Sequence, residues 1–301
     1  MNLLLTGAFK YNKEQLNKIE AMGYRITFIQ DERKMLELDC SEFDAVVCNA
    51  LFLYTPIEKF SSLKFIQATS AGLDRMPLEY IAKNKICLKN AKGVYSVPMA
   101  EWCICKILDI YKQSLFFMKN KDNGVWEKHR GLIELSGKTA VIIGAGDIGT
   151  QIAKRLSAFD VKVLAVDIFE PESLYFNKYY NISELNSVLS LSDIVIITLP
   201  LTDDTRNLFD LKILQRMKEG SIIINISRGG IINENALADV LENGKLMAAA
   251  LDVFENEPLP LESRLWNVKN LLLSPHNSFV SENNSERLFK VIYNNLKNLI
   301  S

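Results

Sequence analysis

Three polar residues with complementary chemistry each follow an apolar run in the second half of the chain. Arg228 comes after SIIINIS, Asp252 ends MAAALD, and His276 comes after NLLLSP. If these runs are neighbouring strands of a parallel sheet, their carboxyl ends meet at the edge where ligands bind. A guanidinium group can hold a substrate carboxylate and polarise a carbonyl, and an imidazole can protonate the carbonyl oxygen as a hydride arrives. Together the three residues favour reduction of a 2-keto acid.

A carboxylate near His276 would fix the orientation of its imidazole and favour the protonated form. Glu255 and Glu257, in the segment FENEPL, are the candidates. Taken one at a time, these residues have simpler interpretations. An arginine before a Gly-Gly turn is commonly solvated, acids in a proline loop are commonly exposed, and a histidine after Ser-Pro can cap a loop. Their order on successive predicted strand ends favours the chemical interpretation.

The segment GAGDIG, which begins at Gly144, follows the apolar run TAVII and precedes a helical pattern. In this arrangement Gly144 permits a tight turn, Gly146 lets the backbone approach a pyrophosphate, and Gly149 allows the helix to pack closely on the strand. The start of the helix, with Asp147 and Ile148, then faces the phosphate charge. Glycine-rich turns between a strand and a helix also occur for purely structural reasons. The residues that follow must therefore distinguish a dinucleotide-binding turn from a structural one.

Asp167 completes this pattern. It ends the next apolar run, VKVLAVD, 23 residues after Gly144, close to the spacing expected for the acid that binds the ribose. A carboxylate accepts hydrogen bonds from a ribose 2′-OH but repels a 2′-phosphate, and residues 168–170 supply no arginine to reverse this preference. The sequence therefore predicts NAD as the cofactor, in preference to NADP.

Short apolar runs alternate with helical patterns along almost the whole chain. Continuous Val/Ile/Leu strands with helical crossovers are typical of parallel sheets covered on both faces, so the predicted fold class is α/β. There are too many runs for one sheet of ordinary size, and we expect two α/β domains. The boundary is predicted near residues 93–98, before a long helix over residues 99–120. A last helix, over residues 286–300, has one apolar stripe, and its periodicity leaves open which domain it packs on.

The composition limits the classes of partner. Lys and Arg total 35 against 36 Asp and Glu, and no basic stretch points to nucleic acid or to an anionic membrane surface. The start of the chain lacks signal-peptide features, and no run approaches the length that spans a bilayer. The five cysteines lack metal or CxxC spacing, so we expect reduced, buried thiols, no metal site and a cytoplasmic protein. His129, in the charged segment WEKHRG, is predicted to lie on the surface.

The chain resembles the D-isomer-specific 2-hydroxyacid dehydrogenases over nearly its whole length, most densely from GKTAVIIGAGDIG to SPHNSF. NISRGG matches the motif whose arginine binds substrate and polarises the carbonyl, which implies that role for Arg228. DVFENEPL matches the motif whose acid directly precedes proline, which implicates Glu257 and not Glu255. SPH matches the motif of the family's proton donor, which implicates His276.

The resemblance also implies contacts with the cofactor and the substrate. Asp252 matches an acid near the nicotinamide carboxamide. LPLTDDTRNL matches a loop that lines the cofactor site, with Pro200 and Thr205 as the implied contacts. SAGLD resembles a glycine loop whose backbone N–H groups hold the substrate carboxylate, which implicates Ala71 and Gly72.

For the fold, the resemblance implies two Rossmann-like or flavodoxin-like domains with parallel sheets. Residues 1–95 and 280–301 are expected to form a discontinuous substrate domain, and residues 96–279 a central NAD-binding Rossmann domain. A small 2-keto or 2-hydroxy acid would bind in the cleft between them, where domain closure excludes water. The helix after SVPMAEW belongs to an arm that usually builds a homodimer, so a homodimer is expected.

Two segments depart from the family pattern. Family members often have small residues such as Gly or Ala after the histidine, whereas this chain continues with Asn277, Ser278 and Phe279. Phe279 is expected to narrow the pocket or to mark a subgroup. Where phosphoglycerate-specific relatives carry an arginine, this chain has Leu51 and Phe52, which disfavours a phosphorylated substrate and favours an apolar side chain.

Two alternative functions stay open. A formate dehydrogenase shares this fold, but a glutamine accompanies the histidine in those relatives, so Glu257 argues against it. A dinucleotide-sensing binding module, like the transcriptional corepressors that keep this architecture, can retain Arg228, Glu257 and His276. A turnover assay with 2-keto acids separates the sensor from the enzyme.

Overall fold

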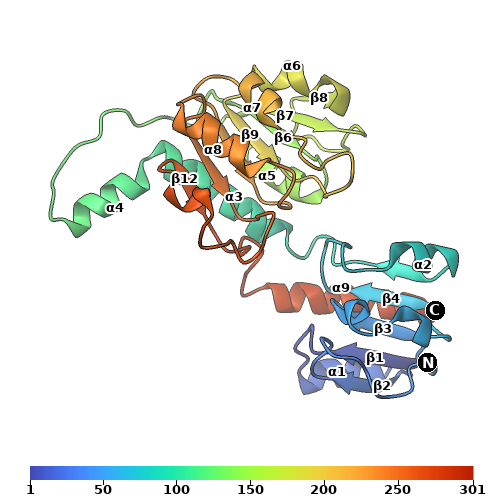
Figure 1. The fold of residues 1–301 in the computed structure, drawn as a ribbon. Helices are drawn as coiled ribbons and strands as arrows, with labels where there is room; N and C mark the ends of the chain where they lie inside the picture. The colour runs from blue at the N-terminus through green and yellow to red at the C-terminus, as the bar shows by residue number, and fades with distance from the viewer. Residues whose placement is uncertain (301) are drawn as a thin grey trace. The chain divides into compact units, whose positions relative to one another are not determined.

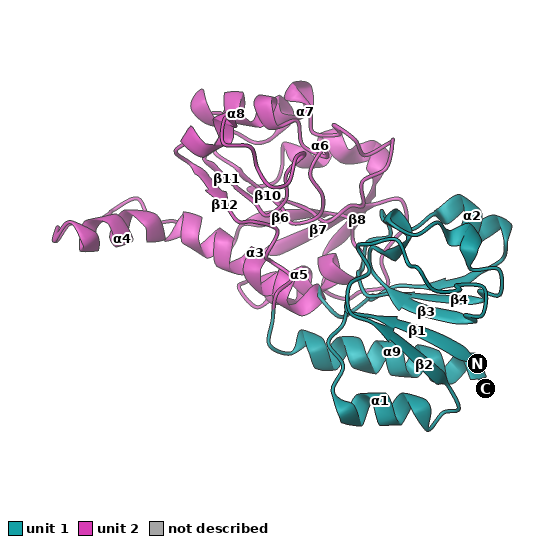
Figure 2. Ribbon diagram, turned by 60° about the horizontal axis from the view of Figure 1, so that its bottom comes forward, with its two compact units in different colours: residues 1–95, 281–301 teal, residues 96–280 magenta. Residues whose placement is uncertain are grey.

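The computed structural model describes residues 1–300 and has α/β architecture with two sheets, in which all paired strands are parallel (Figure 1). This architecture confirms the predicted fold class. The chain forms two compact units (Figure 2). Unit 1 is residues 1–95 together with the C-terminal segment from Ser281, and unit 2 is residues 96–280.

Unit 1 is built on a five-stranded sheet with the strand order β2-β1-β3-β4-β5. Its strands are β1 (Asn2–Thr6), β2 (Arg25–Ile29), β3 (Ala45–Cys48), β4 (Phe65–Ala68) and β5 (Cys87–Lys89). Its helices are α1 (Lys13–Glu20), α2 (Leu78–Lys83) and α9 (Asn284–Ile300), with short 3-10 turns η1 (Leu51–Leu53) and η2 (Ile57–Lys59). Every strand coincides with an apolar run of the sequence.

Alternate side chains of the unit 1 strands pack on opposite faces of the sheet. On one face, Leu3 and Leu5 of β1 share a core with the apolar stripe of α9. On the other face, Leu4 packs in a second core. A hydrogen bond also holds α9, because Tyr24 Oη donates to the carbonyl oxygen of Leu296 at 2.8 Å. The C-terminal helix, whose partner the periodicity left open, therefore packs on unit 1.

Unit 2 is built on a seven-stranded sheet with the strand order β12-β11-β10-β9-β6-β7-β8. Its strands are β6 (Thr139–Ile143), β7 (Lys162–Asp167), β8 (Lys178–Asn181), β9 (Ile194–Ile197), β10 (Ile222–Asn225), β11 (Ala248–Leu251) and β12 (Leu271–Leu273). Its helices are α3 (Ser96–Tyr111), α4 (Ser114–Asp122), α5 (Asp147–Ser157), α6 (Leu185–Leu189), α7 (Leu211–Arg216) and α8 (Glu234–Glu242), with 3-10 turns η3 (Ile182–Glu184) and η4 (Arg264–Asn267).

The central strands of unit 2 are apolar along their whole length because helices cover both faces of the sheet. Every residue of β9, β10 and β11 is buried. Apolar residues of α6, α7 and α8 share one core with the sheet, while α5 packs on β6 and β7 and also against α3. Since β10, β11 and β12 are parallel neighbours, the segments that follow them leave the same edge of the sheet.

Two elements differ from the sequence predictions. The single helix predicted over residues 99–120 is wrong: α3 ends at Tyr111 and α4 begins at Ser114. Gln113 has a φ of 54°, in the left-handed region that ends a right-handed helix. The strand β8 was not predicted, because its sequence KYYN carries no aliphatic run and it lies at the edge of the sheet.

The cysteines are all free thiols, but they do not all lie in the core. Cys40, Cys48 and Cys103 are buried as predicted, whereas the prediction is wrong for Cys87 and Cys105, which are exposed. Cys87 lies on the edge strand β5, and Cys105 lies on α3 away from its buried residues. Neither side chain is therefore covered by the core. No helix within residues 1–300 combines the length and apolarity needed to cross a membrane.

Candidate active site

The ends of β10 and β11 bring Arg228 next to the loop that carries the acids. Asn225, the last residue of β10, shapes the turn: its side chain donates to the carbonyl oxygen of Arg228 at 2.9 Å and accepts the N–H of Ser227 at 3.0 Å. Gly229 then lies so close to the next loop that a Cβ atom would overlap the carbonyl oxygen of Phe254. The backbone after Arg228 therefore packs directly on the backbone that leads to Glu257.

His276 and Glu257 form a close pair. Nδ1 of His276 lies 2.8 Å from Oε2 of Glu257, and Oε1 of the same carboxylate accepts the N–H of Phe254 at 3.0 Å. The side chains are 40% and 35% exposed, so the imidazole is oriented by the acid and still reaches solvent. Glu255 does not take this position: its backbone N–H donates to the side chain of Glu234 at 2.7 Å.

Asp252 organises the loop that carries His276. Its buried carboxylate accepts the hydroxyl of Ser274, the N–H of Asn277 at 2.8 Å and the N–H of Ser278 at 2.9 Å. Its carbonyl oxygen also accepts the N–H of His276 at 2.8 Å. These bonds surround His276, which has a φ of 51°. Residues other than glycine rarely adopt this region of backbone conformation. Asp252 thereby fixes the backbone that carries the imidazole.

The glycine turn between β6 and α5 is open where a phosphate group would approach. Gly144 has a φ of 99°, and a Cβ atom at Gly149 would overlap the carbonyl oxygen of Gly144. At Gly146, by contrast, an added Cβ would meet nothing within 4 Å. Asp147 and Ile148 form the first turn of α5, where Asp147 accepts a hydrogen bond from the hydroxyl of Ser96. A helix N-terminus with free space before it suits an anion.

Asp167 lies at the end of β7, beside this turn. Its Oδ2 accepts the N–H of Ala145 at 2.6 Å, and its Oδ1 accepts the N–H of Ile168 at 2.7 Å. The carboxylate is therefore held against the glycine turn by backbone donors. This is the edge of the strand pair β6 and β7 where the ribose of a dinucleotide would lie.

Comparison with known proteins identifies the family. The family model described as D-isomer specific 2-hydroxyacid dehydrogenase, NAD binding domain, matches residues 104–278, which is more than half of the chain. The chain belongs to this family. A glyoxylate reductase from Thermofilum pendens is 33% identical to it over an alignment of 276 residues, which covers 89% of this chain and 78% of that protein.

Two further relatives cover most of this dehydrogenase. A hydroxypyruvate reductase from Thermotoga maritima is 33% identical over an alignment of 271 residues, which covers 88% of this chain and 85% of that protein. A crystal structure of a D-isomer specific 2-hydroxyacid dehydrogenase family protein from Aeromonas salmonicida matches with a TM-score of 0.80 and 29% identity, covering 98% and 94% of the two chains. The protein is thus an NAD-dependent oxidoreductase of the D-2-hydroxyacid dehydrogenase class. The open space at Gly146 and the carboxylate at Asp167 fit that cofactor.

The other cofactor contact implied by the family motif lies in the loop after β9. Thr205 is half-buried, and its hydroxyl donates to the carbonyl oxygen of Pro200 at 2.7 Å and accepts the N–H of Thr202 at 2.7 Å. These bonds close a compact turn that starts at the end of the strand next to β6. The turn presents its backbone at the same sheet edge as the glycine turn, and its contact with NAD stays a prediction.

The residues implicated in substrate binding by the glycine loop belong to unit 1. The loop after β4 is shaped by two side chains: Ser70 donates to the carbonyl oxygen of Gly72 at 2.7 Å, and Asn90 donates to that of Ala71 at 2.6 Å. These bonds fix the carbonyl oxygens of Ala71 and Gly72, and the binding of a substrate by their N–H groups stays a prediction. Arg228 and His276 belong to unit 2.

The apolar segment at residues 49–55 divides between the core and the surface of unit 1. Leu51 is fully buried in the core of unit 1, and Phe52 packs edge-to-face on Phe60 with ring centroids 5.6 Å apart. Leu51 therefore has no exposed surface with which to contact a substrate. Leu53 and Tyr54 are the exposed apolar residues of this segment, at 59% and 45%.

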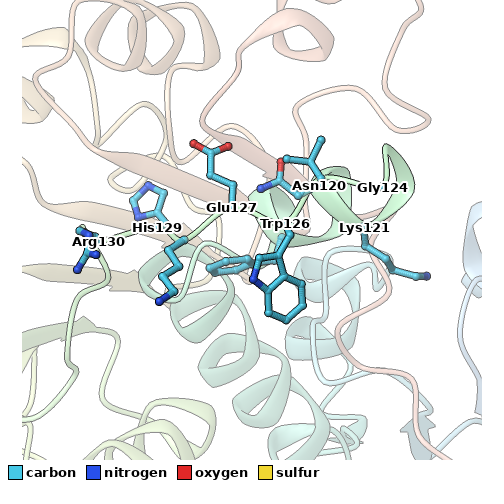
Figure 3. Close-up of a pocket in the computed structure, with 10 residues that line it drawn as sticks. Asn120, Lys121, Gly124, Trp126, Glu127, His129 and Arg130 are labelled. Atoms are coloured by element: carbon cyan, nitrogen blue, oxygen red, sulfur yellow. The ribbon is translucent and has the colours of Figure 1, made fainter.

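A pocket of about 820 Å³ lies in unit 2, in the segment that follows α4 (Figure 3). It combines apolar walls from Phe117 and Trp126 with the basic side chains of Lys121 and Arg130. His129, predicted to lie on the surface, is half-buried here: its ring meets Phe116 edge-to-face at 5.1 Å. In Figures 1 and 2 this segment extends away from the unit 2 sheet, so it is separate from the strand ends.

Proposed function

We propose that this dehydrogenase reduces a small, unphosphorylated 2-keto acid reversibly to the D-2-hydroxy acid with NADH. The observation that carries the proposal is the 2.8 Å contact between His276 Nδ1 and Glu257 Oε2, at the sheet edge where Arg228 follows a neighbouring strand. An imidazole oriented by a carboxylate is suited to transfer a proton. A formate dehydrogenase-like activity has no use for such a pair, because formate oxidation protonates no alkoxide.

Each polar group has one role in this reaction. The guanidinium of Arg228 binds the substrate carboxylate and polarises the adjacent carbonyl. Bound NADH supplies the hydride that reduces the carbonyl carbon. His276 donates the proton from Nε2 to the carbonyl oxygen, and Glu257 accepts the hydrogen bond from Nδ1–H and balances the charge of the imidazolium. In the oxidative direction the same imidazole accepts the proton.

The residues near the pair favour a small substrate. Phe279 lies edge-to-face against the imidazole of His276, with ring centroids 5.9 Å apart, and a ring at this position limits the room beside the proton donor. The names of the relatives, glyoxylate reductase and hydroxypyruvate reductase, fit acids of this size. The segment NALFLYT has no cation to bind a phosphate.

The experiment follows NADH absorbance with pyruvate, glyoxylate, hydroxypyruvate and branched 2-keto acids. We expect turnover with at least one of the small acids, and kcat for His276→Ala lower by about 10² to 10⁴ with NADH affinity unchanged. Glu257→Gln should also lower kcat, whereas Glu255→Gln is its matched control, because the Glu255 side chain is exposed and outside the pair. Wild-type turnover retained in His276→Ala would reject the assignment. NADH binding without turnover of any acid would favour the sensor.

The two units divide the work in this proposal. Residues 96–279 bind NAD, and residues 1–95 with 280–301 form the substrate domain, in which the N–H groups of Ala71 and Gly72 receive the substrate carboxylate. Replacing Ala71 by proline removes one of these donors. We expect a higher KM for the keto acid with little change in NADH affinity, measured by initial rates and by nicotinamide fluorescence.

We also propose that the protein is a cytoplasmic homodimer built by the arm that contains α4. Trp126 is 97% exposed, and Leu115 and Met118 are 57% and 61% exposed, which leaves an apolar surface on the arm for a second copy. Light scattering after gel filtration should give twice the chain mass for the wild type and a lower mass for Trp126→Ala. The control is Leu261→Ala, because Leu261 is 93% exposed outside the arm. A monomeric wild type at micromolar concentration would exclude the dimer.

A further inference from the structure

Glu234 is a half-buried acid that the sequence did not single out. It is the first residue of α8, directly after the helix cap, which Asn233 provides by accepting the N–H of Ala236 at 2.9 Å. The carboxylate of Glu234 is therefore not needed as the cap. It reaches instead to the loop after β11 and accepts the N–H of Glu255 at 2.7 Å.

This hydrogen bond fixes one side of the loop that presents Glu257. The N–H of Phe254 is bonded to Glu257 itself at 3.0 Å, and the carbonyl oxygen of Phe254 lies against Gly229. The N–H of Glu255, the next donor along the chain, is bonded to Glu234. Glu257, Gly229 and Glu234 thus each contact the backbone of Phe254 or Glu255. This backbone positions the carboxylate of Glu257, which contacts His276. Displacement of this loop would move Glu257 relative to the imidazole.

The carboxylate of Glu234 lies near other acids. Burial raises the pKa of Glu234 above its ordinary value against the effect of the hydrogen bond from the N–H of Glu255, and the carboxylates of Glu255 and Glu257 also raise it. Asp252 adds another buried carboxylate to the same sheet edge. Burying a carboxylate beside like charges costs free energy, and groups held in this way are commonly found at functional sites.

We propose that Glu234 is a positioning residue for the proton-donating pair: its carboxylate holds the backbone at Glu255 so that Glu257 faces His276. The inference rests on the proposed function and adds a residue to it. Glu234 touches neither the substrate nor the imidazole in this account, and it acts through the loop.

Two substitutions test the hydrogen bond. Glu234→Ala removes it, whereas Glu234→Gln keeps an oxygen that can accept the N–H of Glu255 and should retain the wild-type behaviour. Glu286→Gln is the matched control, because Glu286 is an exposed acid in the first turn of another helix, α9. A role limited to the stability of α8 would lower Tm without changing the dependence of activity on pH.

The chain has only two histidines, so their imidazole C–H signals can be followed separately by NMR in the cofactor-free protein, with His129→Gln used for assignment. In Glu234→Ala we expect the titration midpoint of the His276 signal to fall relative to Glu234→Gln, because a displaced Glu257 stabilises the imidazolium less, while the midpoint of His129 stays constant. The pH above which kcat for keto acid reduction declines should move in the same direction. Glu234→Ala should also lose about tenfold in kcat, with the NADH dissociation constant unchanged.

Two results would overturn the inference. One is a His276 midpoint in a folded Glu234→Ala protein equal to that of the wild type and of Glu286→Gln. The other is wild-type kcat in the same variant; if Glu234→Ala does not fold, Glu234→Asp, whose side chain is one methylene shorter and retracts from the N–H of Glu255, takes its place in both measurements. Since the titration needs no substrate, its outcome is independent of whether the wild type turns over a 2-keto acid, and the two proposals can fail separately.

Discussion

The carboxylate of Asp252, directly after β11, accepts the backbone N–H of Ser278, beyond the end of β12, at 2.9 Å. The same carboxylate accepts the N–H of Asn277 at 2.8 Å and the hydroxyl of Ser274. These donors lie on both sides of His276, whose φ of 51° is one that the chain adopts only when its surroundings impose it. The position of the imidazole therefore depends on a buried charge one strand away.

Asp252→Asn should damage this loop. An asparagine presents an NH₂ group where three donors converge, so at least one buried donor loses its acceptor. We expect the free energy of unfolding to fall by about 2–4 kcal/mol and kcat to fall with it, measured by urea denaturation and by initial rates. Asp239→Asn is the comparison, because Asp239 forms only an exposed ion pair with Arg264. Equal stability of the two variants would show that the Asp252 bonds contribute little.

The sequence predicted the elements whose own residue types indicate their structure. The strands with continuous aliphatic runs were all found, because burial on both faces demands such residues. The strand β8 was missed because KYYN lies at a sheet edge and needs no apolar run. The break between α3 and α4 at Gln113 was missed for another reason. A left-handed φ in a residue other than glycine is set by its surroundings, so the residue type does not indicate it.

The candidate site shows the same division. The positions of Arg228 after β10 and of His276 after β12 were predictable, because each follows a recognisable apolar run. The choice of Glu257 over Glu255 came from a family motif, and the structure pairs Glu257 with the imidazole. Glu234 was not predictable, because its 2.7 Å bond to the N–H of Glu255 joins positions 21 residues apart through the fold alone.

The glycines of the cofactor turn should separate binding from stability. At Gly146 an added Cβ meets no protein atom within 4 Å, so Gly146→Ala should keep Tm near the wild-type value while the methyl group obstructs the pyrophosphate. We expect at least a tenfold weaker NADH affinity, equivalent to about 1.4 kcal/mol, measured by fluorescence titration. In Gly149→Ala the Cβ overlaps the carbonyl oxygen of Gly144, and we expect a loss of about 1–3 kcal/mol in stability. The reverse pattern would contradict the assignment of the turn.

Asp167 should set the preference between the two nicotinamide cofactors. Its carboxylate is fixed by the N–H groups of Ala145 and Ile168. A 2′-phosphate placed there would therefore be repelled by a negative charge whose position is fixed. Asp167→Ala should lower kcat/KM for NADH and raise the ratio of NADPH to NADH kcat/KM by about tenfold or more. Glu170→Gln removes an exposed acid three residues later and should leave the ratio unchanged. A wild type that uses NADPH better than NADH would contradict the role of Asp167.

Asp193 joins β6 and β9 at the amino ends of the strands, whereas the candidate site lies at their carboxyl ends. Its Oδ2 accepts the N–H of Thr139 at 2.9 Å, and its Oδ1 accepts Lys218 Nζ at 2.7 Å. Burial acts to raise the pKa of Asp193, but the hydrogen bonds from Lys218 and Thr139 outweigh it and lower the pKa below its ordinary value. The folded protein therefore binds fewer protons at this carboxyl than the unfolded chain does when the solution is acidic.

The sign of the effect follows from this difference. A carboxyl whose pKa is lowered by folding contributes its stabilisation above the unfolded pKa of roughly 3.9, and the contribution is lost as the pH falls through the folded pKa. Asp193→Asn should lower the free energy of unfolding by about 1–2 kcal/mol at pH 7, and the gap to the wild type should close below about pH 4. Urea denaturation across this pH range measures the gap, with the exposed Asp203→Asn as control. A gap that persists unchanged at pH 3 would assign the loss to packing and not to the charge of Asp193.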